Sequence, residues 1–407
     1  MALPPSAADG QVLANYTHPD IGTVKLHHAG SPLNPPLVRL NLDEHLRLDF
    51  DDLADVPMEL DYTIIHCTPD WEPSNLLHHD YATGFELNSL PPGRSSQGTN
   101  PLYTHHSLSL PNDDTRWTLS GNYVLRVVDR HDHDRIVLQR RFWVHDPMVQ
   151  PEARVVQASG AQRTTGQRIE LELDLAPLGL GVDPFREIVV CIAQNNQIHN
   201  ARHNIKPVFV GGSRARYSAP DSLVFEGGCE HRNLVYRSSS YRSQQIAHTR
   251  RLGGETHVGL TPDRPYLHPA YTEQTDLNGR YLPLRDDCYD PSIEAEYAWF
   301  YFTLASPELP QDEVYLYLGE ADAWQLIPTH AMRYSAIDGA YETRVRLKQG
   351  IYSYRYLHID RSTGRVGHSL LEGNHSATEN SYQIYVYHKP RSSQHWQLVG
   401  YSELKSR

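Results

Sequence analysis

Short runs of alternating apolar and polar positions fill the first third of the chain. Each run has the length of a β-strand, is rich in β-branched and aromatic residues, and is bounded by Pro, Gly, Asn or Asp. Residues 71–81 form the one segment with the character of a short helical turn, and residues 90–101 form a polar loop rich in Pro and Gly. We predict strands at residues 38–42, 46–53, 58–67, 103–110, 122–129 and 135–144.

The strand pattern resumes after a linker with two prolines at residues 146–153. It is lost between residues 236 and 290, where we predict a surface excursion with one or two strands. Elsewhere the spacing of strands is typical of β-sandwiches, and helical heptads are absent. The further predicted strands are residues 168–175, 187–195, 206–210, 223–228, 295–304, 314–320, 341–347, 350–360, 381–389 and 396–404.

These patterns predict an all-β protein built from tandem immunoglobulin-like or early-set β-sandwich units. We expect an N-terminal sandwich at residues 1–147 and a middle β domain, which includes the irregular excursion, at residues 148–290. An early-set-like sandwich is expected at residues 291–407. A chain of 407 residues is long enough for each unit to bury a core of its own.

Composition and charge exclude several classes of function. Lys and Arg number 37 against 49 Asp and Glu, a net charge of −12 that disfavours nucleic acid as a partner. No apolar run reaches the roughly 20 residues of a membrane-spanning helix, so no direct membrane span is expected. The start, MALPPSAADGQ, has neither a basic head nor an apolar stretch, so no secretory signal peptide is visible in this chain.

Motifs for catalysis or cofactors are also missing. The chain has no HExxH, GxSxG, Walker or GxGxxG motif. His131 and His133 have a spacing suited to sharing a metal ion from one strand, but they fall on a predicted hairpin tip, which favours a solvated turn. Asp49 and Asp51 share one strand face; we interpret them as charge exposed at a strand end beside a buried Phe50. We therefore expect no metal, no cofactor, no small-molecule substrate and no enzyme activity.

Several segments, in order along nearly the whole chain, resemble the plug proteins of the type IX secretion system. They are LDFDDL (48–53), YTIIHCTPDWEPS (62–74), YTHHSLSLPND (103–113), SGNYVLRV (120–127), RRFWV (140–144), AQN (193–195), FEGGCE (225–230), LKQGIYSYRYL (347–357), EGNHSATENSYQIYVYH (372–388) and LVGY (398–401). This chain departs from the family in Cys229 within the FEGG stretch and in the missing signal peptide.

The resemblance implies a periplasmic protein, peripheral to the outer membrane, that binds the inner mouth of the outer-membrane translocon barrel. It would seal the pore when no substrate occupies it, by protein–protein interaction and without catalysis. A wide aqueous lumen needs such a cover to keep the outer membrane a barrier. We expect the partner contact near Trp71 and near Arg94 in the loop 90–101.

Two alternatives stay open. The third block also resembles carbohydrate-binding modules of the glycogen-binding type, which would make the chain a carbohydrate-binding accessory protein. Trp324 stands where those modules stack a ring on a sugar, and Lys348 is placed to contact a hydroxyl group. The other alternative is a hydrolase that uses Asp49 and Asp51, for which the sequence offers only the presence of the two acids.

Overall fold

The computed structural model describes residues 12–197, 200–217, 223–238, 243–267 and 271–406. Strands make up nearly all of its regular structure, which confirms the prediction of an all-β fold of sandwich units. The α-helices in the described part, α1 (His78–Tyr81), α2 (Pro291–Glu294) and α3 (Ser369–Glu372), have four residues each. None of the helices that the structure describes is long and apolar enough to cross a membrane.

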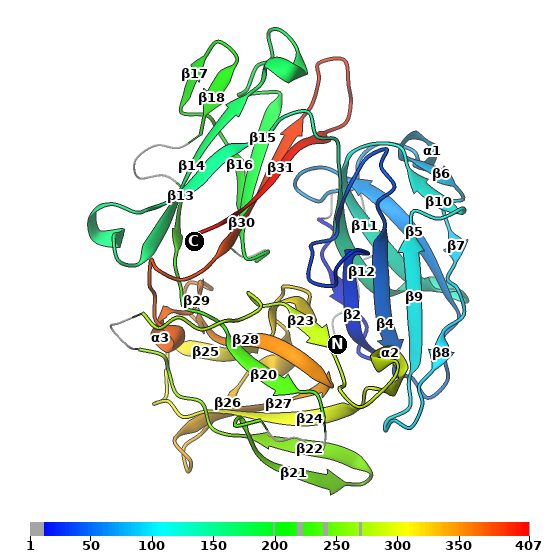
Figure 1. Ribbon diagram of the computed structural model, residues 1–407, viewed down its shortest axis with the longest axis vertical. Coiled ribbons are helices and arrows are strands. Elements are labelled where there is room, and N and C mark those ends of the chain that lie inside the picture. Colours follow the sequence, from blue (N-terminus) through cyan, green and yellow to red (C-terminus); the bar gives the residue numbers. More distant parts are fainter. Residues whose placement is uncertain (1–11, 198–199, 218–222, 239–242, 268–270, 407) are drawn as a thin grey trace.

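The first unit is a sandwich that appears in blue and cyan on the right of Figure 1. Alternation puts Leu46, Leu48 and Phe50 of one strand into its core, where they meet large rings such as Tyr123 and Phe142 from the facing sheet. One sheet has the order β1 (Tyr16–Thr17), β12 (Asp132–His145), β11 (Gly121–Asp129), β5 (Leu60–Cys67), β7 (Asn88–Ser89), and β3 (Leu37–Arg39) also pairs with β12. The facing sheet has the order β2 (Ile21–His28), β4 (Leu46–Asp52), β9 (Thr104–Leu110), β8 (Arg94–Ser95). A small ribbon pairs β6 (Ala82–Gly84) with β10 (Thr115–Trp117).

The second unit combines strands from two distant parts of the chain. Apolar side chains such as Ile169, Val190 and Ile384 form its core. Its sheets are β13 (Glu152–Gln157), β14 (Gly166–Asp174), β18 (Arg214–Arg216), β17 (Phe209–Gly211), with β19 (Val224–Glu226) on β14, and β16 (Arg202–Ile205), β15 (Ile188–Gln194), β30 (Ser381–His388), β31 (Gln397–Lys405). In Figure 1 the red β30 and β31 accordingly lie among the green strands of this unit.

The third unit, at the bottom of Figure 1, holds the rings of Tyr352, Tyr354 and Tyr356 in its core, as their alternation along one strand predicts. One of its sheets joins β20 (Arg232–Tyr236), β28 (Gly350–Asp360) and β23 (Tyr281–Pro283), with β25 (Asp312–Tyr317) and β29 (Val366–Gly367) also on β28. The other has the order β21 (Ile246–Leu252), β22 (Glu255–Leu260), β24 (Tyr297–Leu304), β27 (Ala340–Lys348), β26 (Arg333–Ser335). The predicted excursion thus contains a hairpin, β21–β22, that extends a sheet.

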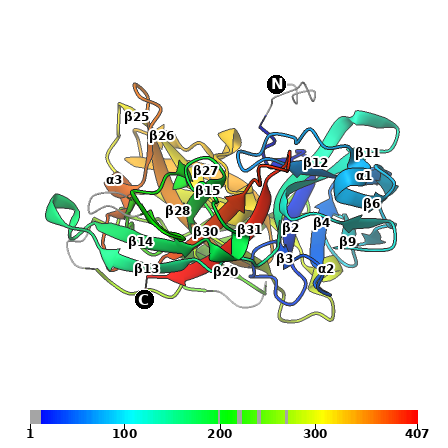
Figure 2. The ribbon, with the colours of Figure 1, turned by 90° about the horizontal axis from the view of Figure 1, so that it is seen from above.

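Strand pairing crosses the expected boundary at residues 290 and 291 in both directions. β20 to β23 precede that boundary but pair with third-unit strands, whereas β30 and β31 follow it and pair within the second unit. Period-2 patterns identify strands but carry no information about distant partners. As a result, the C-terminal strand β31 lies between the rest of the second unit and β12 of the first unit (Figure 2).

Candidate functional site

Four of the residues singled out in the sequence lie at two contacts between the units. Trp71 and Trp324 line one cavity at which all three units meet. Arg94 and Lys348 lie at the contact between the first and third units, where both donate hydrogen bonds to Ser292. The two contacts differ in how they treat buried charge.

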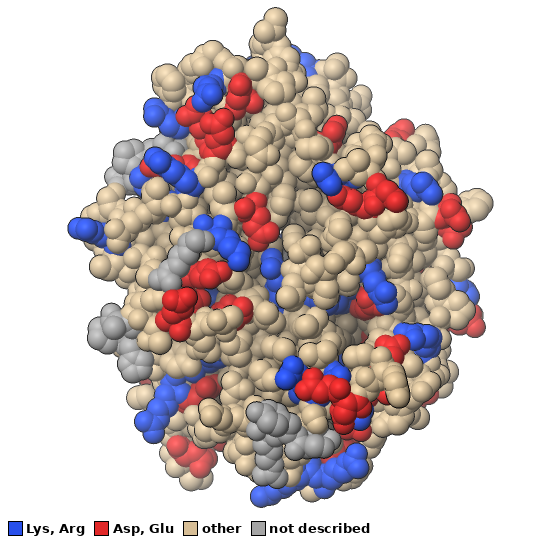
Figure 3. All heavy atoms as spheres, viewed as in Figure 1, with Lys and Arg blue, Asp and Glu red and all other residues tan. Residues whose placement is uncertain are grey.

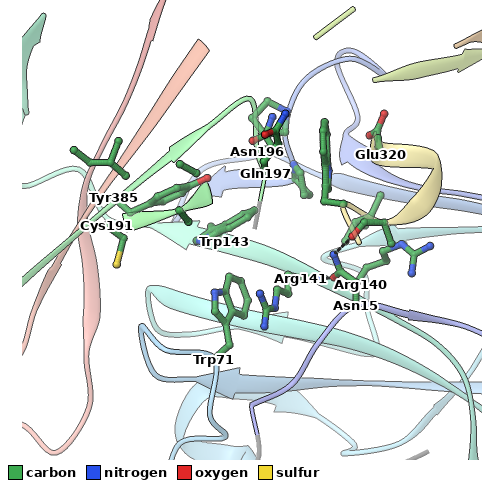
Figure 4. A pocket seen from close by; sticks show the side chains of 18 of the residues that line it. Asn15, Trp71, Arg140, Arg141, Trp143, Cys191, Asn196, Gln197, Glu320 and Tyr385 are labelled. Carbon is green, nitrogen blue, oxygen red and sulfur yellow. Dashed lines mark hydrogen bonds between the residues drawn. The ribbon is translucent and has the colours of Figure 1, made fainter. Parts of the chain in front are cut away.

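The cavity has a volume of about 110 Å³ (Figure 4). The first unit lines the cavity with two adjacent arginines of β12, Arg140 and Arg141, and with the indole rings of Trp71 and Trp143. The second unit contributes Asn196 and Tyr385, and the third unit contributes Glu320 and Trp324. A volume of this size holds several water molecules or one side chain of a ligand.

Aromatic rings from two units form one wall of the cavity. Trp143 stacks on Tyr385 of the second unit, with ring centroids 5.0 Å apart and planes at 19°. Trp71 meets Trp143 edge-on at 5.3 Å and 81°. The guanidinium of Arg141 lies over the Trp71 ring, 4.4 Å from its centroid. The wall is therefore apolar with a cation beside it.

Both indole-bearing loops of the cavity have an unusual backbone. Trp71 ends a tight turn after β5, in which its N–H donates to the carbonyl of Thr68, and its φ is +68°. Ala323 and Trp324 follow a short 3₁₀ turn with φ of +55° and +60°. Bulky residues rarely adopt this left-handed region, and such strained positions cluster at functional sites. Asn196, which also lines the cavity, has φ of +59°.

Trp71, near which the sequence places the partner contact, is buried, with 6% of its surface exposed. Trp324 is only partly buried, and its ring packs so closely on Gly279 that a Cβ at that glycine would lie 3.0 Å from the indole. The Trp324 ring therefore belongs to the junction cavity and does not form an open platform on the third unit.

The charges in the cavity are predominantly positive. Among the residues that the structure describes, neither Arg140 nor Arg141 forms an ion pair with a carboxylate, whereas Glu320 is paired with Lys25 at 2.5 Å. Burial lowers the pKa of Arg140 to about 10 and that of Arg141 to about 10, because desolvation disfavours the charged form. Arg140 donates to the carbonyl of Tyr16, and Arg141 donates through Nε to the carbonyl of Leu13.

The contact between the first and third units holds a compensated charge network. Lys348 is 1% exposed, and its Nζ lies 2.7 Å from Asp51 Oδ2 and 2.7 Å from the Ser292 carbonyl oxygen. Tyr297 donates to the same Asp51 oxygen at 2.7 Å, and His105 Nδ1 lies 2.8 Å from the other. Lys348 is therefore not available to a sugar hydroxyl, which removes one of the two contacts of the carbohydrate alternative.

This network also corrects the interpretation of Asp49 and Asp51. Asp51 is fully buried, so the expectation of two charges exposed at a strand end was wrong. Burial of the Asp49 carboxylate would raise its pKa, but hydrogen bonds to His105, His27 and Arg47 outweigh burial and hold that pKa below its usual range. Burial of the His105 ring would lower its pKa, but hydrogen bonds to Asp49 and Asp51 outweigh burial and raise it. Each acid thus has a basic partner; Asp49 is paired within the first unit, whereas Asp51 joins the first unit to Lys348 of the third.

Arg94 is half exposed but is already engaged. Its Nη1 lies 2.8 Å from Asp290 Oδ2 and its Nη2 lies 2.8 Å from Ser292 Oγ. The loop around it also donates from the Gln97 N–H to the Ile293 carbonyl. The loop 90–101 therefore joins the first unit to the third, and a partner would reach only the exposed part of Arg94.

Other candidate chemistry is not brought together. His131 lies in the turn between β11 and β12, and its Nε2 is 3.7 Å from Glu59, whereas His133 is near Asp61. In the described ranges no group of three or more His, Cys, Asp or Glu side chains is placed to hold a metal ion. On the face shown in Figure 3, basic and acidic side chains are interspersed.

The sequence did not single out Arg140, Arg141 and Trp143 as residues that line a cavity. They fall within the segment RRFWV, which carried only the family resemblance. The available signal was a pair of adjacent arginines inside an apolar strand, where one of two neighbouring side chains must point toward each face. Tyr385 carried no such signal, since its contact with Trp143 depends on the pairing of distant strands.

Comparisons with known proteins identify a family match for part of the chain and similar solved structures. Residues 21–146 match the model of the type 9 secretion system plug protein 1st domain. A crystal structure of a hypothetical protein from Parabacteroides merdae ATCC 43184 is similar over 97% of this chain and 100% of that chain, with a TM-score of 0.92 and 28% sequence identity. No curated protein matches the chain.

Proposed function

Because residues 21–146 belong to the first-domain family of type 9 secretion system plug proteins, we propose that the chain is a non-enzymatic plug. In this proposal it binds the periplasmic mouth of the outer-membrane translocon barrel and closes the pore when no substrate occupies it. The family match is the observation that carries the proposal. It favours a role in this secretion system and a periplasmic location, and the plug family is not an enzyme family.

The way in which the units are joined supports a role that depends on a fixed shape. Buried ion pairs and hydrogen bonds connect the first and third units, such as Lys348 to Asp51 and Tyr103 to the carbonyl of Ala295. The first and second units share a buried hydrogen bond from Tyr387 to Asn122 and a backbone bond from the Asp146 N–H to the Leu398 carbonyl. A cover over a wide pore must resist distortion, and such interlocked units suit that requirement.

The exposed part of Arg94 is assigned to the partner contact in this proposal, together with the Trp71 region. Arg and Trp are enriched among residues that dominate the energy of protein interfaces. Trp71 itself is buried, so it would contribute only through the cavity that it lines.

Co-purification tests the proposal. The chain, tagged at one end, is expressed in cells that carry the secretion system and is captured from a detergent extract of the envelope. We expect a large outer-membrane barrel to be recovered with it, at a level that falls when untagged chain is added as a competitor. Recovery of no barrel, with the tagged chain intact and monodisperse, would contradict the proposal.

A further inference from the structure

The cavity at the junction of the three units combines three properties that bear on what it can bind. It is lined by aromatic rings from separate units, it contains the buried Arg140 and the partly buried Arg141, neither of them paired with a described carboxylate, and it is framed by bulky residues with positive φ. Each property has a cost or a consequence for what the cavity can bind.

The unpaired arginines are the most informative of these properties. Burying a cation without an anion is expensive, and a chain that only needed to join its units would place an acid beside it. The chain does so for Lys25, which pairs with Glu320 at the edge of the same cavity. Arg141 uses Nε on the carbonyl of Leu13, which leaves its Nη donors beside the cavity. A guanidinium with free donors in a partly desolvated place is a suitable binding group for a carboxylate.

The aromatic wall specifies what accompanies the carboxylate. The rings of Trp71, Trp143 and Tyr385 present both faces and edges to the cavity, and such surfaces pack against planar or aliphatic groups. The volume of about 110 Å³ accommodates a side chain but not a folded element. The cavity therefore suits a short ligand segment in which an acidic group is next to an apolar side chain.

We propose that this cavity receives an acidic peptide segment of a partner protein, with a Glu or Asp carboxylate on Arg141 and a neighbouring apolar side chain against Trp71 and Trp143. The inference rests on the proposed function in one respect, since it takes the partner to be a protein of the secretion machinery. The strained backbones of Trp71 and Trp324 hold the rings apart for the segment to enter.

The test is direct binding to the purified full chain. The probe is the blocked tetrapeptide acetyl-Gly-Phe-Glu-Gly-amide, and the matched probe carries Gln in place of Glu. Three of the chain's six Trp residues line the cavity, so saturable fluorescence changes report binding, and calorimetry gives the affinity. We expect the Glu peptide to bind roughly tenfold or more tighter than the Gln peptide, the difference typical of a hydrogen bond to a charged group.

Variants locate the binding. Arg141→Gln removes the cation and is expected to weaken the Glu peptide roughly tenfold or more while leaving the Gln peptide unchanged. Arg116→Gln, an exposed arginine of β10 remote from the cavity, is the matched control and should bind like the parent. Should Arg141→Gln fail to fold, Trp143→Leu retains the cations, removes one of the rings proposed to contact the apolar side chain, and should weaken both peptides together.

Three results would overturn the proposal: no saturable binding of the Glu peptide, equal binding of both peptides, or displacement of the Glu peptide by inorganic phosphate at equal concentration, which would indicate a general anion site. The outcome is separable from that of the plug proposal. Capture of the barrel without peptide binding rejects the cavity assignment alone, whereas peptide binding without barrel capture rejects the plug proposal alone.

Discussion

Two regions at which the units meet bury positive charge, and they do so in opposite ways. At the contact between the first and third units, Lys348 lies against the carboxylate of Asp51. In the junction cavity, neither Arg140 nor Arg141 forms an ion pair with a carboxylate of the described residues. Glu320 also lines this cavity, but its ion pair is with Lys25. A cation that is paired with a carboxylate of another unit joins the two units, whereas a cation without a carboxylate partner can still bind an acidic ligand.

The comparison explains why one region is a joint and the other a candidate site. In the joint, Tyr297 and His105 satisfy the remaining lone pairs of Asp51, so no binding capacity is left for an outside group. In the cavity, the remaining donors of Arg141 face open volume. Burial alone therefore does not distinguish structure from function; the distinction is whether the chain supplies the counter-ion.

The largest effect is expected from breaking the compensated pair. Lys348→Met leaves the Asp51 carboxylate buried without its cation, which should lower the free energy of unfolding by about 3–5 kcal/mol. Urea denaturation measures this change. The double variant Asp51→Asn/Lys348→Met removes both charges and should recover a large part of the loss. Equal losses in the single and double variants would mean that the pair is not what stabilises the contact.

A smaller, pH-dependent effect is expected from His105. Its pKa is raised in the folded chain, so its contribution is fully present below the pKa of the unfolded state, about 6.5, and is lost as pH rises through the folded value. His105→Gln should therefore cost about 1–2 kcal/mol at pH 5.5 and clearly less at pH 8.5. Asp49 has the opposite dependence, since its lowered pKa gives a contribution that is lost only in acid. A cost for His105→Gln that grows with pH would contradict this assignment.

Removing the uncompensated cation should matter less for stability. Arg141→Met loses one hydrogen bond to Leu13 and the contact of the guanidinium with the Trp71 ring, and it relieves the burial of a charge. These terms offset each other, so we expect the free energy of unfolding to change by no more than about 1 kcal/mol. Measured beside Lys348→Met under the same conditions, a loss as large as for that variant would erase the contrast between the two regions.

The smallest effect is expected at the surface. Arg94 pairs with Asp290 in a half-exposed position, and such pairs contribute about 0.2–1 kcal/mol. Arg94→Ala should shift the urea midpoint only slightly, and 0.5 M salt should reduce the difference further. A loss of several kcal/mol would show that the loop 90–101 is a main support of the contact between the units.

Sequence patterns were sufficient for the fold class but not for the assembly of the units. Alternation correctly identified the strands that carry Phe50 and Tyr352, because the side-chain period is a local property. It did not show that β30 would pair with β15, since pairing partners are chosen by the whole core. The burial of Asp51 was missed for the same reason, because its cation, Lys348, comes from another unit.

Trp71 shows the same limit within the candidate site. The sequence placed the partner contact near it, and the structure shows that its ring is buried. The neighbours that make it part of a cavity, Trp143 and Tyr385, come from β12 and β30. A site that is shared by three units becomes visible only when their arrangement is known.

A conductance measurement tests most directly the proposal that this chain closes a translocon pore. The purified barrel is inserted in a planar bilayer, and the chain is added on its periplasmic side. If the chain closes the pore, we expect the large open conductance to fall in steps to a closed level and to return when the chain is washed out. An open conductance that persists at saturating concentrations of folded chain would contradict it.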